Sequence, residues 1–425
     1  MENIIENKSG HYRVLFTGLL IFGLALPLSK SISSITIGLI YAYCLAIVAY
    51  DKNFRETVIR HIKQPLNVSI FLFVLVAFLR SLFSKNFPEG MSFVKQVSNL
   101  FIVYLIVSVL ISSEQDEQRR RKNAETLLLF FLAGIFTLDL LGLLTYFGLI
   151  GNQRYTLPFS PLNMHHIWAG NLNAIGLYVS SCLLLLSPRN RIIPRSIFIS
   201  LFLIICLISV LLSTSRTAWL GIFVTGIISI YVLIKNKQIY FITAVSIITG
   251  YVFLYLFNNI IHTRINQIFS DLSLFFSGIT STSIGLRLLM WKAAIEMFLS
   301  NPLFGVGPGD YKSTIAGFVS EGRFPDSILK FNQPHNMFLF TLAISGIIGL
   351  SALLFIFYKI LRFSRNLVGP LHKERLFGFL ALSVIIHFMA AGLTESLLNI
   401  HVLISTFAFI MGVSVRGPVS NEPPS

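Results

Sequence analysis

The stretch Pro334–Ile360, PHNMFLFTLAISGIIGLSALLFIFYKI, places a polar His-Asn pair directly before a long apolar run. The run is long enough to cross a hydrocarbon layer of about 30 Å. Proline is favoured in the first turn of a helix, so Pro334 predicts that the helix begins there, with His335 at its N-terminus. The positive end of the helix dipole and partial desolvation both disfavour an imidazolium ion. We therefore predict a neutral His335 beside the bilayer surface, able to accept a proton.

Composition indicates a polytopic membrane protein. The chain has 425 residues, of which 54% are hydrophobic and only 12% are charged. An ordinary soluble domain has about 25% charged residues, so this class is excluded. Neither a disulfide framework nor a zinc site is indicated, because all three cysteines lie inside apolar runs without paired spacing: Cys44, Cys182 and Cys206.

The expected fold is an all-α polytopic membrane protein with about twelve transmembrane helices. Nine of the predicted spans fall in residues 1–257 and three in residues 335–415, with a cytoplasmic tail at 416–425. A large periplasmic loop, residues 258–334, lies between them. The spans are predicted at 14–29, 31–50, 66–83, 94–112, 125–150, 167–187, 195–213, 217–234, 239–257, 335–361, 375–394 and 398–415.

Basic residues give the orientation. Placing both termini in the cytoplasm puts most of the 33 Lys and Arg residues on the cytoplasmic side, as the positive-inside rule requires. His335 then faces the periplasm. The net charge of +15 follows from this topology and from contact with membrane lipids, and does not indicate nucleic-acid binding.

The large loop is predicted to contain structure of its own. Ser283 followed by Ile284–Leu299 predicts a helix whose apolar face lies on the membrane or caps the bundle. The glycine-rich stretch Asn301–Asp310 is a weak nucleotide motif, since no strand precedes it and no helix clearly follows it. We predict instead that it forms a bent loop over the outer site.

Arginines on the outer face run against the topological bias, so two of them are candidate ligands for phosphate. Arg216 begins a span after a turn of Ser and Thr whose hydroxyl groups could cap that helix. A helix N-terminus beside a guanidinium group suits a phosphate. Arg287 lies one turn into the predicted loop helix. From the residues alone, contact with lipid headgroups explains either arginine as well.

Other polar residues on the outer side are secondary candidates. Arg154 lies with His165 and His166 in the loop before the sixth span, where they could bind phosphate, acceptor or nothing. Glu395, between the last two spans, could orient the acceptor or His335. No Asp-x-Asp motif lies on the predicted outer side, which disfavours metal-dependent handling of sugar nucleotides.

Two ionisable residues lie inside predicted spans, where they are costly to place. They are Asp139 and His387. We expect them to pair with each other or with Arg80 and to serve the structure of the bundle.

The spacing His335-Asn336, nine residues, Gly346, two residues, Gly349 resembles the signature of bacterial O-antigen ligases, in a wider family that includes O-antigen polymerases. The resemblance covers most of the chain. It includes one arginine after a Ser/Thr-rich turn and one ahead of the His-Asn motif, which correspond to Arg216 and Arg287. From the residues alone, a helix-start histidine and glycines that allow close helix packing explain the same stretch.

The resemblance implies a GT-C-like, inverting glycosyltransferase without metal or cofactor. It would transfer O-antigen polysaccharide from undecaprenyl diphosphate to the lipid A-core oligosaccharide, on the periplasmic face of the bacterial inner membrane, in lipopolysaccharide biosynthesis. Arg216 and Arg287 would bind the diphosphate, while His335 would remove or orient the proton of the acceptor hydroxyl. Asn336 would support His335, with Arg154 and Glu395 as further substrate-binding candidates.

Two other functions stay open at this stage. An O-antigen polymerase would use the same donor with a lipid-linked glycan as acceptor, and the His-Asn spacing favours the ligase. A polysaccharide or lipid transporter is less favoured, because the sequence has no clear internal repeat and its charged candidates gather at one face.

Overall fold

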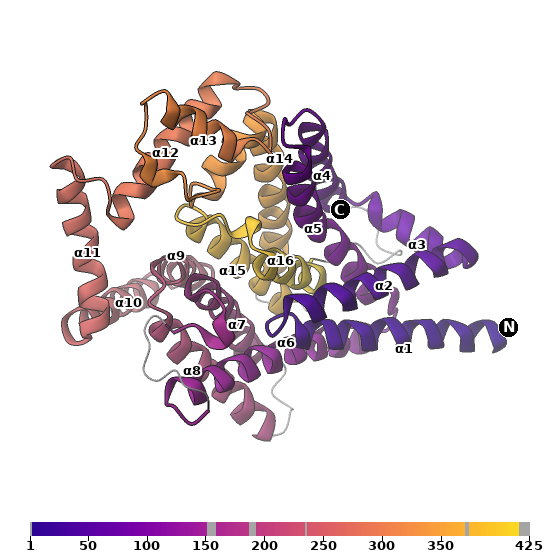
Figure 1. Ribbon diagram of the computed structural model, residues 1–425. Helices are drawn as coiled ribbons and strands as arrows, with labels where there is room; N and C mark the ends of the chain where they lie inside the picture. Colours follow the sequence, from indigo (N-terminus) through magenta and orange to yellow (C-terminus); the bar gives the residue numbers. More distant parts are fainter. Residues whose placement is uncertain (1, 151–158, 187–192, 234–235, 370–373, 416–425) are drawn as a thin grey trace.

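The computed structural model describes residues 2–150, 159–186, 193–233, 236–369 and 374–415 (Figure 1). Within these ranges the regular structure is helical and no strand is found. The α-helices are α1 (Glu2–Ala25), α2 (Lys30–Tyr50), α3 (Lys52–Ile62), α4 (Pro65–Leu82), α5 (Phe87–Ser113), α6 (Glu117–Tyr146), α7 (His166–Leu186), α8 (Ile193–Ser213), α9 (Arg216–Leu233), α10 (Lys237–Phe257), α11 (Asn259–Phe276), α12 (Ser283–Ser300), α13 (Tyr311–Ser320), α14 (Met337–Leu367), α15 (Arg375–Ala391) and α16 (His401–Ser414).

The membrane helices agree with the predicted spans. Among the described residues, nine helices are long and apolar enough to cross a membrane. Three shorter apolar helices, Gly10–Ala25, Arg375–Ala391 and His401–Ser414, match the remaining predicted spans. The all-α polytopic membrane fold is therefore confirmed. The division into cytoplasmic and periplasmic parts stays a prediction.

Helices α15 and α16 form the centre of the bundle. α15 packs against α7, α9 and α14, and α16 packs against α5. Almost every residue of both helices is buried, which explains why their sequences are apolar on all sides. By contrast, none of the described side chains of α10 is fully buried, so this apolar helix lies at the edge of the bundle, where it contacts α9 and α11.

The two ionisable residues inside the bundle have other partners than those predicted. Asp139 accepts a hydrogen bond of 3.0 Å from Asn173. His387 is within 2.9 Å of the hydroxyl group of Tyr178. The predicted pairing of Asp139 with His387 or Arg80 is wrong, because amide and hydroxyl groups on α7 bond to these residues and no ion pair joins them among the described residues.

Helices α11, α12 and α13 occupy residues 259–320 and lie together at one side of the molecule, with α12 and α13 beside the start of α14 (Figure 1). The predicted helix corresponds to α12, while α11 and α13 were not predicted. A second hydrophobic cluster joins α12 and α13 to the first half of α14 through residues such as Met297, Ile315 and Ile344. The second half of α14 belongs to the main core.

The helix α14 is broken at Gly346, where φ is 61° and ψ is −162°. A Cβ at this position would lie 2.4 Å from the backbone of Leu303, so only glycine fits. The backbone groups released by the break bond to the loop before α13: Val306 N–H donates to Ala343 O at 2.8 Å, and Ile347 N–H donates to Pro302 O at 2.9 Å.

The glycine-rich loop Asn301–Asp310 is fixed to the bundle at both ends. Besides its contacts with α14, the Asp310 carboxylate accepts hydrogen bonds of 2.9 Å from the backbone N–H groups of Lys85 and Asn86, in the turn between α4 and α5. Arg80 donates to the carbonyl of Gly305 at 3.1 Å. The loop is bent as predicted, with turns along its length and positive φ at Gly305 and Gly307, and its position over the outer site stays a prediction. Its glycines allow it to approach two other backbones closely.

Candidate active site

The turn between α8 and α9 presents Arg216 at a helix N-terminus. The hydroxyl group of Ser215 accepts a hydrogen bond of 3.3 Å from Ala218 N–H, which caps the first turn of α9 as the sequence predicts. Thr214 has a φ of 52°, so the chain reverses sharply there. The turn fixes the first residue of α9, and with it the origin of the Arg216 side chain.

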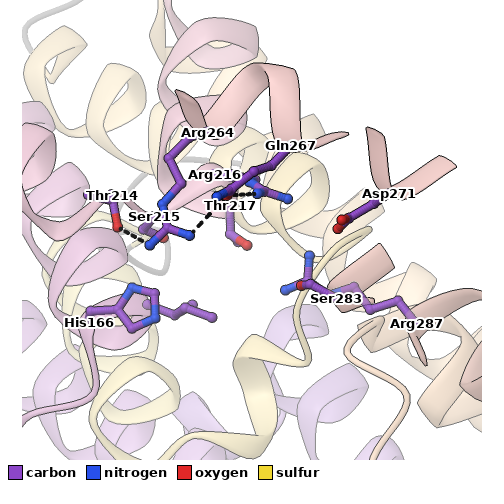
Figure 2. Close-up of a pocket in the computed structure, with 11 residues that line it drawn as sticks. His166, Thr214, Ser215, Arg216, Thr217, Arg264, Gln267, Asp271, Ser283 and Arg287 are labelled. Carbon is purple, nitrogen blue, oxygen red and sulfur yellow. Dashed lines mark hydrogen bonds between the residues drawn. The ribbon is translucent and has the colours of Figure 1, made fainter. Parts of the chain in front are cut away.

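Three half-buried arginines line one cavity of about 390 Å³. They are Arg216 on α9, Arg264 on α11 and Arg287 on α12. Figure 2 shows Arg216, Arg264 and Gln267 on one side of the cavity and Arg287 across from them. The remaining lining residues are His166, Ile167, Thr214, Ser215, Thr217, Asp271 and Ser283.

Polar neighbours hold two of the guanidinium groups in place. Arg216 donates to the amide oxygen of Gln267 at 2.9 Å, and Arg264 donates to the hydroxyl group of Thr214 at 3.2 Å. Within the described ranges, no ion pair joins Arg216, Arg264 or Arg287 to a carboxylate. Three like charges around one cavity, with no ion pair to a carboxylate, favour a ligand that brings negative charge, although Asp271 also lines the cavity.

Burial acts on the third arginine. It lowers the pKa of Arg287, and the charge of Glu395 opposes this shift. The guanidinium group stays charged at neutral pH, because the pKa of a free arginine is far above this range. A partly desolvated cation of this kind gains most from a ligand that brings negative charge to it.

The helix that carries the His-Asn motif begins later than predicted. α14 starts at Met337 and Asn336 is its N-cap, with the side-chain oxygen accepting from Phe338 N–H and Leu339 N–H at 3.0 Å each. Pro334 is therefore outside the helix. The short side chain of asparagine satisfies the first N–H groups, which fixes the helix start more strongly than the favourable φ of proline.

His335 lies just before this cap and faces a carboxylate. Its φ is 50°, a left-handed conformation that is uncommon for a residue with a Cβ. Its Nδ1 is 3.0 Å from both oxygens of Glu395, whose side chain is only 2% exposed. An ionised carboxylate only accepts hydrogen bonds, so Nδ1 carries a proton in this contact, and Nε2 is the acceptor in the neutral form of the ring.

Glu395 is held in its ionised form. Burial raises its pKa, but the hydrogen bond and charge of His335, the N–H of Ser396 and the charge of Arg287 lower it, and the net pKa is below the usual value. Gln333 also donates to Glu395, at 3.3 Å. The ring of His335 is thus in direct contact with a buried carboxylate, a contact that the prediction from the helix dipole did not include.

The arginine cavity and the pair of His335 and Glu395 lie close to each other. Arg287 and Glu395 each experience the charge of the other. The indole N–H of Trp291, one turn after Arg287 on α12, donates to the carbonyl of Pro334 at 3.0 Å. α12 therefore connects the arginine cavity to the segment that carries His335.

The remaining candidates have different positions. The side chain of Asn336 caps α14 and donates to the carbonyl of Leu393 at 2.9 Å, so it supports the backbone beside His335. His166 lines the cavity, with Nδ1 3.0 Å from Ser213 O. Burial lowers the pKa of His165, which experiences the charges of Glu395 and His335. Arg154 lies outside the described residues.

Sequence reasoning missed Arg264 and its neighbours. The long loop was expected to matter little for topology, and its first helix was not predicted. Arg264, Gln267 and Asp271 follow a spacing of three and four residues, which places them on one face of α11. That periodicity is the signal that could have identified them.

Comparisons with known proteins agree with this geometry. A family model described as O-antigen ligase matches residues 201–354, a range that contains all three cavity arginines and His335. An uncharacterized protein of Haemophilus influenzae is 31% identical over 220 residues, which cover 50% of this chain and 54% of that protein. The match thus spans about half the length of the relative. The similarity to the O-antigen ligase family model over residues 201–354 agrees with the resemblance that the His-Asn stretch indicates.

Proposed function

We propose that this protein is an O-antigen ligase of the bacterial inner membrane. It would transfer a polysaccharide from undecaprenyl diphosphate to a hydroxyl group of the lipid A-core oligosaccharide, with the site facing the periplasm. The observation that carries the proposal is the cavity of three half-buried arginines without a carboxylate ion pair, next to the pair of His335 and Glu395. The family match at residues 201–354 supports the same class of reaction.

The arginine cavity binds the diphosphate of the donor in this proposal. As the bond between the anomeric carbon and the diphosphate oxygen breaks, its electron pair passes to the diphosphate and adds negative charge there. Guanidinium groups that are already oriented stabilise this charge where it develops. Arg216, Arg264 and Arg287 would do this together, with Gln267 and Thr214 holding two of them.

His335 acts as the base. Its Nε2 takes the proton from the acceptor hydroxyl as the hydroxyl oxygen attacks the anomeric carbon, and the ring becomes an imidazolium ion. Glu395 orients the ring through Nδ1–H and stabilises the positive charge. A single displacement of this kind inverts the anomeric centre. Protons and charges balance without a further reactant.

A polymerase would share the donor site and differ in the acceptor. The deciding experiment is transfer by the purified protein in lipid vesicles, with undecaprenyl-diphosphate-linked glycan as donor and two acceptors offered separately. Transfer to lipid A-core supports the ligase. Transfer only to a second lipid-linked glycan would replace it with the polymerase, and the absence of transfer to either would refute the proposed function.

A further inference from the structure

A second basic cluster lies away from the arginine cavity, where α2, α5 and α16 meet. It consists of the cations Lys30, at the start of α2, and Lys95, on α5, together with His401 at the start of α16. The hydroxyl group of Ser34 on α2 is 3.2 Å from Nε2 of His401 on α16. Nδ1 of His401 is buried and has no hydrogen-bond partner among the described residues.

The two lysines are exposed cations. Among the ion pairs of the described part of the chain, none involves Lys30 or Lys95. His401 is the first residue of α16, and its N-cap, Ile400, provides no side-chain hydrogen bond. Two ammonium groups beside an uncapped helix start form a surface for a group with negative charge.

The cluster is connected to the catalytic segment. Gln96, next to Lys95, donates to the carbonyl of Leu398 at 3.4 Å and to the side chain of Asn399 at 3.3 Å. Leu398 and Asn399 belong to the short 3-10 helix Leu397–Asn399, which begins two residues after Glu395. Glu395, which contacts His335, therefore closely precedes the segment that Gln96 binds beside Lys95.

The same stretch of α5 also reaches α14. Phe93 packs edge-to-face against Phe340 on the first half of α14, with ring centroids 6.0 Å apart. Lys95 therefore lies on a helix that contacts both elements beside the candidate base.

The helices that carry the two lysines and those that carry Arg216 and Arg264 lie on different sides of α14 to α16. Figure 1 shows α2 and α5 on one side of α14 to α16, and α9 to α11 on the other. None of the three cluster residues lines the arginine cavity. Two lipid-linked substrates cannot occupy the same place in the membrane. The donor and the acceptor must therefore reach His335 from two different binding sites.

We propose that Lys30, Lys95 and His401 bind the phosphate-bearing head group of the acceptor glycolipid and direct its sugar hydroxyl to His335. This inference rests on the proposed function and names the subsite for its second substrate. Lysine binds phosphate as a compact point charge with three donors, which suits a phosphate that varies in orientation. The chemistry is the same for lipid A-core and for a lipid-linked glycan acceptor, since both carry phosphate next to their lipid.

The test is transfer kinetics in phosphatidylcholine vesicles with the double variant Lys30→Glu/Lys95→Glu. We expect the KM for the acceptor to rise about tenfold, with kcat and the KM for the donor unchanged, because the two cations contribute to binding of one substrate only. The double variant Lys30→Arg/Lys95→Arg should restore most of the acceptor affinity. Lys312→Glu, an exposed charge reversal on α13, is the matched control and should match wild type.

An acceptor treated with phosphatase completes the test. The KM of wild type for the dephosphorylated acceptor should rise to the KM of the double Glu variant. The KM of that variant should be the same for the phosphorylated and the dephosphorylated acceptor. An unchanged acceptor KM in the double Glu variant would overturn the inference, as would an equal rise with phosphorylated and dephosphorylated acceptor. If wild type transfers no glycan at all, the proposed function itself has failed.

A second comparison separates the acceptor from bulk lipid. The ratio of the acceptor KM of the double Glu variant to that of wild type is first measured in phosphatidylcholine vesicles. Adding phosphatidylglycerol should change this ratio by less than about twofold, because a specific subsite prefers its own substrate. A ratio that falls to one in these vesicles would show that the lysines bind any anionic headgroup. That result would refute the subsite.

Discussion

Replacing Glu395 with glutamine tests how the carboxylate acts on His335. The substitution keeps the shape of the side chain and removes its charge. Both carboxylate oxygens lie 3.0 Å from Nδ1, and the Glu395 side chain is 2% exposed, so water cannot take over its role. The imidazolium ion that forms during proton transfer would then face a neutral amide.

The expected loss follows from these contacts. A hydrogen bond to a charged group contributes about 1.5–3 kcal/mol, against about 0.5–1.5 kcal/mol for a neutral one. The difference is about 1.5 kcal/mol in the transition state, which corresponds to about tenfold in kcat. The loss is larger if the amide N–H turns towards Nδ1, because the ring then adopts the tautomer with its proton on Nε2.

The assay is glycan transfer in vesicles at saturating donor and acceptor. Glu89→Gln, which makes the same change at an exposed position near the start of α5, is the matched control and should retain wild-type kcat. Thermal unfolding should show that the Glu395→Gln variant is folded. A folded variant whose kcat falls by less than about threefold would refute the assigned role of Glu395.

Three further predictions concern other parts of the molecule. Arg264→Ala should raise the KM for the donor and weaken pyrophosphate binding about tenfold, while Arg264→Lys recovers part of it, and equal binding by all three proteins would contradict the cavity assignment. Gly346→Ala should lower thermal stability, because the left-handed φ and the 2.4 Å approach to Leu303 admit no Cβ; Gly250→Ala, where no atom lies within 4 Å, is the control. Because the pKa of Glu395 is lowered in the folded protein, its stabilisation is present above the unfolded pKa of about 4.3 and is lost only as the pH falls through the lower folded value. The difference in melting temperature between wild type and Glu395→Gln should therefore persist at pH 5, and its disappearance there would contradict the lowered pKa.

The sequence was most informative where a single segment determines its own structure. Long apolar runs predict membrane helices because the hydrocarbon layer requires a fixed length of apolar side chains. The Ser-Thr-Ser turn before Arg216 predicts a capped helix start for a similarly local reason. Both features appear in the structure as expected.

The sequence was less informative where two distant segments meet. Glu395 contacts His335 across 60 residues; the sequence offered this contact as one of two roles for Glu395, but no local pattern could choose between them. The partners of Gly346 are likewise in the loop near Leu303, so a glycine interpreted as a packing residue proved to mark a helix break. The start of α14 was misplaced because Pro334 and Asn336 are both good start signals, and only the structure shows that Asn336 caps the helix.

The most direct test of the central claim is the rate of glycan transfer by His335→Ala in the reconstituted system with lipid A-core as acceptor. Base catalysis typically contributes a factor of about 10²–10⁴, so we predict a loss of that size with pyrophosphate binding at the wild-type level. The variant keeps the arginine cavity, which His335 does not line. Transfer by folded His335→Ala at the wild-type rate would contradict the account.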